Sequence, residues 1–266
     1  MLRYVYNLYY KGELMMKRIL LVLLVLATAA GLAVAKGGPE AGGKPKIVIA
    51  TDATWPPMEM VNESKQIVGF DIDLMKAAAE AGGFTVEFRN TAWDGIFAGL
   101  EAGEYDAVMS SVTITDERKQ TMDFSVPYIN AGQILIVRKE LTGVEKLEQL
   151  KGKNVGAQIG TTGAFEIEKV MGVTLKTYDE IGLAFEDLAN GRIMGVVCDT
   201  PVAAQFALQN DNYKGKLKIV GKPFTEEFYG VAAKKGNAKP LDLINNGLKK
   251  VLNTAAYDKI YAAWLK

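Results

Sequence analysis

The sequence has 266 residues, with 31 Lys or Arg, 31 Asp or Glu and no His, so its formal net charge is zero. This balance gives no basic footprint for nucleic acid, and the absence of histidine excludes Ser-His and Cys-His nucleophilic sites and the usual histidine-bearing zinc and iron sites. Cys198 is the only cysteine, which excludes a disulfide framework. We expect no cofactor, no metal site and no nucleic-acid partner.

The N-terminal region has the pattern of a secretory signal peptide. Two basic residues, Lys17 and Arg18, precede the uncharged run 19–35, which ends in the small-x-small sequence Ala-Val-Ala. We expect cleavage after Ala35 and a periplasmic location. A membrane anchor is the alternative, although the run is at the short limit for crossing a bilayer and its second half is mostly alanine and glycine.

The start and extent of the mature chain follow from this pattern. Met15 or Met16 fits as the true translation start better than Met1, because the first fourteen residues match no part of a signal peptide. Cleavage would leave a near-neutral, slightly acidic chain that is long enough for one large or two small domains. Its first residues, 36–45, are rich in glycine and predict a flexible leader.

Strand and helix patterns alternate through the first part of the mature chain. Lys46–Ala50 is a short β-branched run, typical of a buried parallel strand. The elements predicted after it are a helix over 71–81 with Gly82-Gly83 as its stop, a strand over 84–88, a helix over 94–102 and a strand over 106–109. The short connections between them favour a parallel α/β sheet.

The same alternation returns in the second half of the chain. The predicted elements are strands 154–157, 174–177 and 194–198, helices 164–171 and 180–189, a further strand 227–233 and a helical tail over 240–266. Two segments of similar design indicate two lobes that face each other. We expect lobe 1 to contain 46–130 plus 231–266, lobe 2 to contain 138–222, and the segments 131–137 and 223–230 to be the two crossings of a hinge.

The segment from Tyr105 to Arg118 contains the first candidate binding residues. Ser110, Ser111 and Thr113 place hydroxyls and backbone N–H groups at the carboxyl end of a predicted strand, and Arg118 follows in a helix-start context. Hydroxyls, free N–H groups and a guanidinium together suit a small carboxylate. The alternative is a buried strand followed by a capped surface helix with Arg118 in solvent.

Residues of the second half can complete a site for an α-amino acid, which carries both a carboxylate and an ammonium. The backbone amides of Thr161 and Thr162, in a Gly-Thr-Thr-Gly helix start, can add donors for the carboxylate. Asp199 can accept from the ammonium, helped by the Thr113 hydroxyl or the Ser111 carbonyl. The alternatives are an ordinary helix entry at Thr161 and a plain N-cap at Asp199.

Two tryptophans lie on loops at the carboxyl edge of the first predicted sheet. Trp55 and Trp93 can close on a ligand side chain, and their faces favour a guanidinium or an amide plane. Filling of the core is the alternative for either ring. Asp52 and Glu59 flank Trp55 and can face a cationic side chain, although a solvated loop charge is the stronger expectation for Glu59.

As a set, the motifs resemble one known family. They are ATDATWPPMEM at 50–60, GFDIDLM at 69–75, SSVTITDER at 110–118, DFSVPY at 123–128, GTTG at 160–163 and CDTP at 198–201. The chain resembles the periplasmic polar amino-acid-binding proteins of ABC importers, solute-binding protein family 3, which are also similar to the ligand-binding core of ionotropic glutamate receptors, a ligand-gated ion channel-like domain. The resemblance covers essentially the whole mature chain. It implies an α/β fold of the two-lobed type II periplasmic binding protein kind, each lobe a mostly parallel sheet flanked by helices, with a two-strand hinge.

The resemblance also implies roles for individual residues. It assigns the ligand carboxylate to Arg118, the ligand ammonium to Asp199 and the rest of the backbone clamp to Ser111, Thr113, Thr161 and Thr162. Trp55 and Trp93 fall on the family's aromatic sandwich, and Asp52 matches a residue that contacts side chains in binders of basic amino acids and of glutamine. Gln158 replaces a lysine of some glutamine binders, which favours a cationic ligand. The expected ligand-binding set is Asp52, Trp55, Trp93, Ser110, Ser111, Thr113, Arg118, Gln158, Thr161, Thr162 and Asp199.

The expected function is therefore capture of a free L-amino acid outside the cytoplasm, without catalysis. Arginine is favoured and glutamine comes next. Closure of the lobes would hold the ligand, and the monomeric protein would deliver it to an ABC transporter permease. The alternative is a cyclohexadienyl dehydratase-like enzyme on the same fold, which needs a general acid over the leaving group. A sensory domain of a larger receptor is disfavoured, because no second membrane span, kinase or cyclase region follows.

Overall fold

The structure is a computed structural model that describes residues 43–266. The expected signal peptide, 1–35, and most of the expected leader, 36–45, lie outside the described residues. Within the described range, no helix combines the length and the apolar character needed to cross a bilayer.

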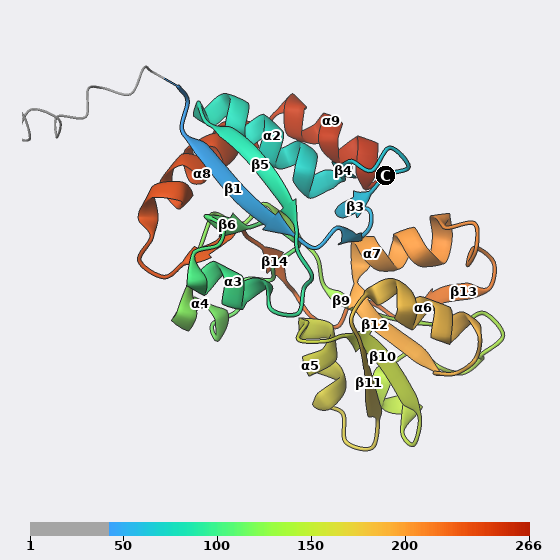
Figure 1. Ribbon diagram of the computed structural model, residues 1–266. Helices are drawn as coiled ribbons and strands as arrows, with labels where there is room; N and C mark the ends of the chain where they lie inside the picture. Colours follow the sequence, from blue (N-terminus) through green and yellow to red (C-terminus); the bar gives the residue numbers. More distant parts are fainter. Residues whose placement is uncertain (1–42) are drawn as a thin grey trace, which may run out of the picture. The chain divides into compact units, whose positions relative to one another are not determined.

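The first lobe is built around a five-stranded sheet with the order β5-β1-β6-β15-β7 (Figure 1). Its strands are β1 Lys46–Thr51, β5 Thr85–Asn90, β6 Ala107–Val108, β7 Met122–Phe124 and β15 Ala232–Lys234. β1 runs parallel to β5 and β6, whereas β15 is antiparallel to both β6 and β7. β15 is thus the only strand of this sheet that runs against the others, which confirms the mostly parallel prediction.

Helices cover both faces of this sheet. They are α2 Phe70–Gly82, α3 Ile96–Ala102, α4 Arg118–Thr121, α8 Ala238–Val251 and α9 Ala255–Trp264. Along β1, Ile47 and Ile49 pack in the core cluster that includes α2 and α8, and Ala50 packs against Ile96 and Leu100 of α3. Because successive side chains of a strand point to opposite faces, an apolar run such as β1 needs cover on both sides.

The predicted end of the first helix is confirmed. Gly83 takes the left-handed conformation with φ of 78°, and its N–H bonds the carbonyls of Ala79 and Glu80. Glycine suits this position because it has no Cβ to clash with the backbone. The left-handed turn at Gly83 ends α2 and lets the chain enter β5 two residues later.

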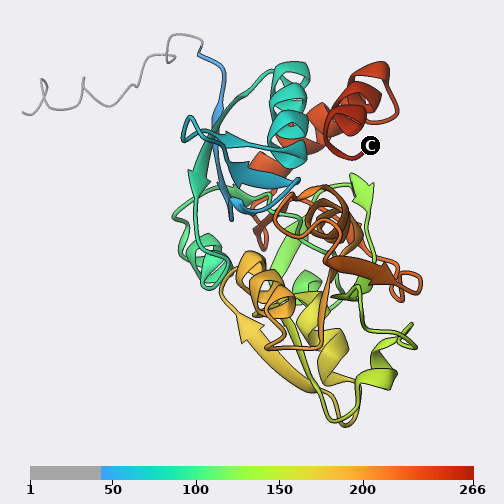
Figure 2. The same cartoon turned by 90° about the vertical axis from the view of Figure 1, so that its right-hand side faces the viewer.

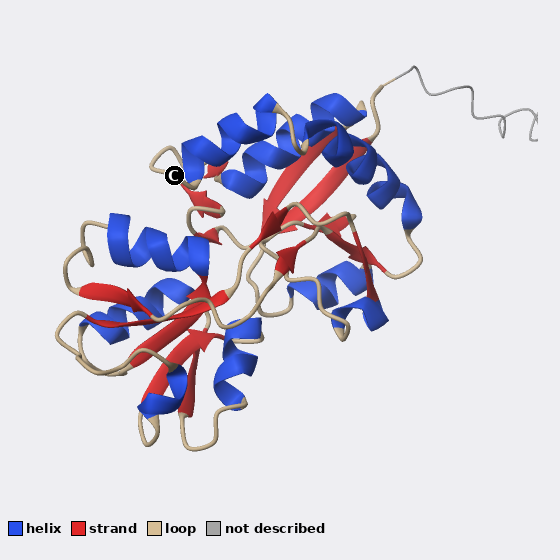
Figure 3. Cartoon of the chain, turned by 180° about the vertical axis from the view of Figure 1, so that it is seen from behind, coloured by secondary structure: helices blue, strands red, loops and turns tan. Residues whose placement is uncertain are grey.

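The second lobe contains another sheet flanked by helices (Figure 3). This sheet has five strands in the order β11-β10-β12-β9-β13. Its strands are β9 Gln133–Arg138, β10 Asn154–Gln158, β11 Thr174–Tyr178, β12 Gly195–Asp199 and β13 Leu217–Val220. Its helical elements are the 3₁₀ turn η1 Leu147–Leu150, the helices α5 Thr162–Glu168, α6 Ile181–Ala189 and α7 Thr200–Ala204, and the π-helical turn η2 Gln205–Gln209. β10 is parallel to β11 and β12, and β9 is antiparallel to β12 and β13. Again a single strand opposes the others.

Two short strands join the lobes. β8 Ile129–Asn130 and β14 Phe228–Tyr229 pair antiparallel, as expected of a two-strand hinge. The strand predicted over 227–233 is in fact two strands, β14 and β15. β14 pairs with β8 and ends at Tyr229, whereas β15 lies between β6 and β7 in the sheet of the first lobe. The predicted crossing 131–137 overlaps β9, which belongs to the second sheet. The lobe boundaries remain a prediction.

The C-terminal tail is two helices where the sequence predicted one helical region. α8 ends before Leu252, and Asn253 has φ of 60°, a left-handed conformation that cannot continue a right-handed helix. α9 then lies beside α2 (Figure 2). The sequence also gave no sign of a small three-stranded sheet, formed by β2 Thr54–Trp55, β3 Glu59–Val61 and β4 Ile67–Val68.

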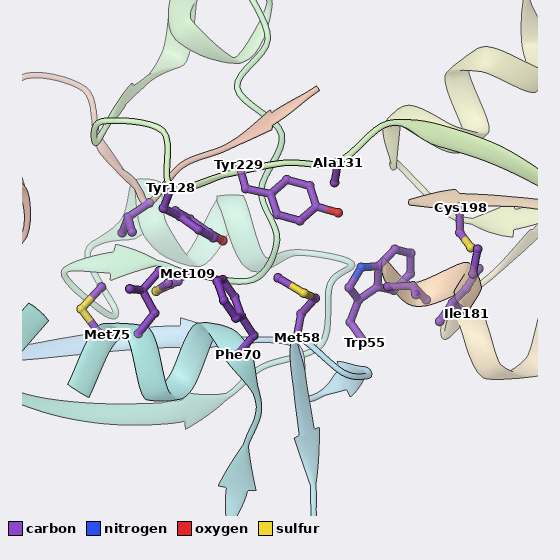
Figure 4. Packing of buried hydrophobic residues seen from close by; sticks show 14 of the residues in the cluster. Trp55, Met58, Phe70, Met75, Met109, Tyr128, Ala131, Ile181, Cys198 and Tyr229 are labelled. Carbon is purple, nitrogen blue, oxygen red and sulfur yellow. The ribbon is translucent and has the colours of Figure 1, made fainter. Parts of the chain in front are cut away.

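Aromatic side chains of the main core gather next to the crossing strands (Figure 4). The ring centroids of Phe70 and Tyr128 are 6.5 Å apart, and those of Tyr128 and Tyr229 are 6.1 Å apart. The same apolar cluster includes Trp55 of the first lobe and Ile181 of the second. The core therefore reaches across the junction between the lobes.

Close packing of α8 on α2 depends on Gly247, where an added Cβ would lie 2.1 Å from the carbonyl oxygen of Ala78. Gly247→Ala should lower the unfolding free energy by about 1–3 kcal/mol, because the helices must separate. Gly182→Ala on α6 is the matched control, since its Cβ would find its nearest neighbour at 3.9 Å and alanine favours a helix. Urea denaturation compares them, and equal stability of the two variants would contradict the expected clash.

Candidate binding cleft

Strands of both lobes deliver candidate residues to one region. Asp52 follows β1, Ser110 lies just beyond β6, and Gln158 and Asp199 end β10 and β12. The carboxyl ends of parallel strands are where open α/β sheets bind ligands. Here they surround a cavity with about 320 Å³ of space between the protein atoms, part of which is open to solvent. Its lining consists of all eleven predicted residues: Asp52, Trp55, Trp93, Ser110, Ser111, Thr113, Arg118, Gln158, Thr161, Thr162 and Asp199.

Arg118 lies in the cavity wall and reaches both lobes. Its Nη1 donates to the carbonyl oxygen of Thr113 at 2.9 Å, and its Nη2 donates to that of Gly160 in the second lobe at 3.3 Å. The guanidinium carbon is 5.6 Å from the ring centroid of Trp93 and 5.3 Å from that of Phe97. The alternative of an arginine in open solvent is therefore wrong.

Asp199 stands at the N-cap position of α7, but its side chain makes no capping hydrogen bond. It is 5% exposed, and its Oδ1 has no hydrogen-bond partner among residues 43–266. Burial raises the pKa of Asp199 to about 7, and the Glu227 carboxylate adds to this shift, whereas Tyr229 and Gln133 oppose it. A plain capping role does not account for this buried carboxyl group.

The charges of Arg118 and Asp199 influence each other without forming an ion pair. Burial lowers the pKa of Arg118, and the carboxylates of Asp199 and Glu227 raise it. An arginine stays protonated under such conditions. Neither Arg118 nor Asp199 is in a salt bridge with any described residue. Both charged groups are thus available to a molecule in the cavity.

Asp52 and Gln158 form a hydrogen bond between the lobes. Gln158 Nε2 donates to Asp52 Oδ2 at 2.9 Å and to the carbonyl oxygen of Asp179 at 2.7 Å, while Thr54 Oγ1 donates to Asp52 Oδ1 at 2.8 Å. Burial raises the pKa of Asp52, and the bonds from Thr54 and Gln158 oppose the shift. These two bonds use both hydrogens of Gln158 Nε2. Gln158 can therefore offer a ligand only its carbonyl oxygen, Oε1.

Thr161 has the role that the ordinary helix entry predicts. It is the N-cap of α5, where its Oγ1 accepts from the backbone N–H of Ala164 at 3.3 Å and donates to the carbonyl oxygen of Gln158 at 2.8 Å. Its hydroxyl is therefore committed to local structure. Thr162 begins α5, and its hydroxyl donates to Glu227.

Glu227, which was not among the predicted site residues, accepts several hydrogen bonds beside the cavity. Its Oε2 accepts from Thr162 Oγ1 at 2.7 Å, from Thr113 Oγ1 at 2.8 Å and from Gln133 Nε2 at 3.4 Å, and its Oε1 accepts from Thr225 Oγ1 at 2.8 Å. Glu227 immediately precedes β14. One carboxylate therefore gathers donors from both lobes at the crossing.

The two serines are bonded to protein partners beneath the cavity. Ser110 Oγ accepts from the backbone N–H of Asp52 at 2.9 Å and donates to Glu59 Oε1 at 3.1 Å. The backbone N–H of Ser111, a residue with φ of 50°, donates to Asp71 Oδ2 at 2.9 Å. That N–H is not free, contrary to the prediction for this segment.

Glu59 and Asp71 form a buried acid pair that sequence reasoning missed. Both are 0% exposed, so the expectation of a solvated loop charge at Glu59 is wrong. Burial and then the charge of Asp71 raise the pKa of Glu59 well above its usual value, and burial raises that of Asp71 to about 6. The Tyr128 hydroxyl donates to Asp71 Oδ2 at 2.7 Å. The one local signal for burial was the methionine on each side of Glu59.

Both tryptophans line the cavity and also pack inside the protein. Trp55 is 6% exposed and belongs to the main core cluster, and its Nε1 has no hydrogen-bond partner in the described part of the chain. Trp93 is 9% exposed and meets Phe97 edge-on, with centroids 5.1 Å apart. Filling of the core thus explains part of their burial. Contact of either ring with a ligand remains a prediction.

With this geometry established, comparison with known proteins places the chain in a family. Residues 47–266 match the bacterial extracellular solute-binding proteins, family 3. The chain belongs to this family. It is 37% identical to a probable histidine-binding protein of Neisseria gonorrhoeae, with 91% of each chain covered. It is 34% identical to the putative ABC transporter arginine-binding protein 2 of Escherichia coli strain K12, over 92% of this chain and 98% of the relative.

Solved structures agree with the family fold. An ancestral arginine-binding protein bound to arginine is 42% identical, with a TM-score of 0.79 over 84% of this chain and 99% of that one. An ancestral amino acid-binding protein that is a precursor of cyclohexadienyl dehydratase is 37% identical, with a TM-score of 0.76 over 83% of this chain and 96% of that one. These similarities confirm the predicted two-lobed α/β fold.

The acid pair makes a testable contribution to pH-dependent stability in this family-3 protein. A raised pKa means that Glu59 binds more protons in the folded than in the unfolded state, so its stabilising contribution is complete below pH 4.5 and is lost as the pH rises. Glu59→Gln, which imitates the protonated acid, should remove this loss. The wild-type unfolding free energy should fall relative to the variant by up to about 1.4 kcal/mol per pH unit above pH 4.5.

Denaturant unfolding of the ligand-free proteins between pH 4.5 and pH 8 measures the difference. Asp116→Asn, at a carboxylate whose side chain is 98% exposed, is the control and should follow the wild type. Parallel curves of unfolding free energy against pH for the wild type and Glu59→Gln would show that the folded acid pair binds no more protons than the unfolded chain.

Proposed function

We propose that this protein is an extracytoplasmic solute-binding protein that captures an L-amino acid between its lobes and delivers it to an ABC transporter. L-arginine is the preferred ligand and L-glutamine the second candidate. Membership of family 3 supports the general role, as do the names of relatives, which include histidine-, arginine-, cystine- and glutamine-binding proteins. In this proposal, the signal peptide is cleaved after Ala35 and the mature protein works in the periplasm as a monomer.

The observation that carries the proposal is the presence of Arg118 and Asp199, both without an ion-pair partner among the described residues, in the wall of one small cavity. A guanidinium can hold a carboxylate through two parallel hydrogen bonds, and a buried carboxylate can accept from an ammonium. An α-amino acid supplies both groups. Buried charges are costly unless they are paired, and such a ligand can pair with both groups.

The charge of the cavity favours a cationic side chain. Its lining includes one basic residue, Arg118, and two acidic residues, Asp52 and Asp199. With these groups ionised the lining carries one negative charge, and an amino acid with a cationic side chain carries one positive charge. Glutamine is neutral and would leave Asp52 without compensation. Gln158 adds only its carbonyl Oε1, and the aromatic faces of Trp55 and Trp93 suit a planar guanidinium better than an ammonium.

Hydrogen bonds across the cleft support a capture step by closure. Arg118 bonds the carbonyl of Gly160, and Gln158 bonds Asp52, so each bond joins one lobe to the other. In the proposed mechanism these contacts belong to the closed state. The ligand stabilises that state because only there does it contact both lobes. The transporter permease then recognises the closed form.

Dehydration on the same fold is the second candidate function. The pKa of about 7 at Asp199 favours it, since such a carboxyl group can hold a proton at neutral pH and act as a general acid. Similarity to a precursor of cyclohexadienyl dehydratase also favours it. The charge of the cavity argues against it, because prephenate carries two carboxylates and the lining contains one guanidinium. Turnover of prephenate or arogenate by the purified protein would establish this function instead.

Removal of the guanidinium tests the proposed capture of an amino acid. Arg118→Ala should weaken L-arginine binding by about 2–5 kcal/mol, because a charge-assisted contact is lost inside a desolvated site. Isothermal titration calorimetry gives the affinity, and Arg192→Ala, on the exposed side of the second lobe, is the control. Near wild-type affinity in Arg118→Ala would contradict the proposal, as would the absence of binding of any of the twenty amino acids to the wild type.

The choice between arginine and glutamine is tested at Asp52. Asp52→Asn removes the negative charge that we assign to the cationic side chain and should lower the ratio of arginine affinity to glutamine affinity by about tenfold or more, since a hydrogen bond between charged groups is worth roughly 1.5–3 kcal/mol. Competition titrations give the ratio. Asp179→Asn removes a charge from the exposed surface nearby and should leave it unchanged. An unaltered ratio in Asp52→Asn would show that Asp52 is not the residue that binds the cationic side chain of the ligand.

A further inference from the structure

Glu227 is a buried carboxylate with no ion pair among residues 43–266 and lies at the crossing between the lobes. It is 7% exposed. Thr113, just beyond β6 in the first lobe, and Thr162, at the start of α5 in the second, donate to the same oxygen, Oε2, at 2.8 and 2.7 Å. Both threonines line the cavity, but Glu227 itself is not part of its lining. The hydrogen bonds of Glu227 therefore reach the cavity through these two threonines.

The direction of these hydrogen bonds fixes what the threonines can offer. A carboxylate accepts only, and a hydroxyl has a single proton. Because that proton is given to Glu227, each threonine oxygen presents only lone pairs to other groups. Gln133 Nε2 donates to Thr162 Oγ1 at 3.1 Å, which uses one lone pair there. Thr113 Oγ1 keeps both of its lone pairs and lies 3.5 Å from Thr162 Oγ1.

We propose that Glu227 is a positioning residue that holds the Thr113 and Thr162 hydroxyls as hydrogen-bond acceptors, and so prepares one wall of the cavity for the α-ammonium of the ligand. This inference rests on the proposed function. Together with the Asp199 carboxylate, the two oxygens form a surface that accepts hydrogen bonds and donates none. A ligand without the α-amino group would leave these acceptors unsatisfied, at a cost typical of buried polar groups. Glu227 thus determines selectivity for amino acids over their deaminated analogues.

Removal of the carboxylate should weaken this selectivity. The probes are L-arginine with 5-guanidinopentanoate and L-glutamine with 4-carbamoylbutanoate, each pair differing only in the α-amino group. Selectivity is the ratio of the two affinities measured by calorimetry. In Glu227→Ala the threonine hydroxyls are free to rotate, so the ratio should fall by about tenfold or more, while the affinity for the deaminated probe stays within about twofold of wild type. Glu226→Ala, the adjacent position on the same crossing, is the control and should keep the wild-type ratio.

Glu227→Gln separates hydroxyl orientation from negative charge. Its single carbonyl oxygen can occupy the place of Oε2 and accept from both threonines, so this variant should retain most of the selectivity. An equal loss in Glu227→Gln and Glu227→Ala would make the charge responsible and overturn the proposal. Equal weakening of both probes in Glu227→Ala would also overturn it, by showing a role in the hinge alone.

Thr113→Val provides the test if Glu227→Ala does not fold. It removes one acceptor and should lower the ratio in the same direction; an unchanged ratio would overturn the proposal. If the wild type binds neither amino acid, the proposed function itself is wrong. If it binds one and the variants keep its selectivity, only the inference about Glu227 is wrong.

Discussion

Electrostatic compensation among buried charged groups is the constraint on which the rest of the site depends. Arg118, Asp52 and Asp199 are placed where burial opposes their charged forms, and the Coulomb interaction between charges is strong where water is excluded. Two of the three, Arg118 and Asp199, come from different lobes and are not paired with each other. In the proposed function, a ligand with the complementary charge pattern completes this arrangement.

The groups around the cavity are held by a second layer of buried acids. Within the first lobe, Glu59 and Asp71 accept hydrogen bonds from Ser110 and Ser111, and at the crossing Glu227 accepts them from Thr113 and Thr162. In both places a buried carboxyl group outside the cavity accepts the hydrogen bonds that the hydroxyl or N–H groups of the lining residues donate. The lining residues are consequently fixed in orientation before any ligand arrives, and a fixed orientation lowers the entropy cost of binding.

Much of the fold followed from local patterns because these patterns have local physical causes. The apolar run of β1 needs two covered faces, and Gly83 permits the left-handed turn that ends α2. The tail was harder, since the left-handed conformation of Asn253 has no strong sequence signature, and the strand over 227–233 divides because its two halves pair with different neighbours. The burial of Glu59 and the role of Glu227 were not predicted, for a related reason. Their burial results from side chains that are 51 and 114 residues away in the sequence.

The alternation of strands and helices and the absence of histidine chemistry followed directly from the amino-acid sequence. The resemblance to solute-binding protein family 3 implied the eleven residues that line one cavity, several of which follow strands whose carboxyl ends converge on one edge of an α/β sheet. The tertiary structure alone decided how those residues are used. It committed the Thr161 hydroxyl to a helix cap and the Ser111 amide to Asp71, left Arg118 and Asp199 without ion-pair partners within residues 43–266, and turned two threonine hydroxyls toward Glu227. The direction of a hydrogen bond depends on which groups are neighbours in space, and those neighbours come from separate lobes.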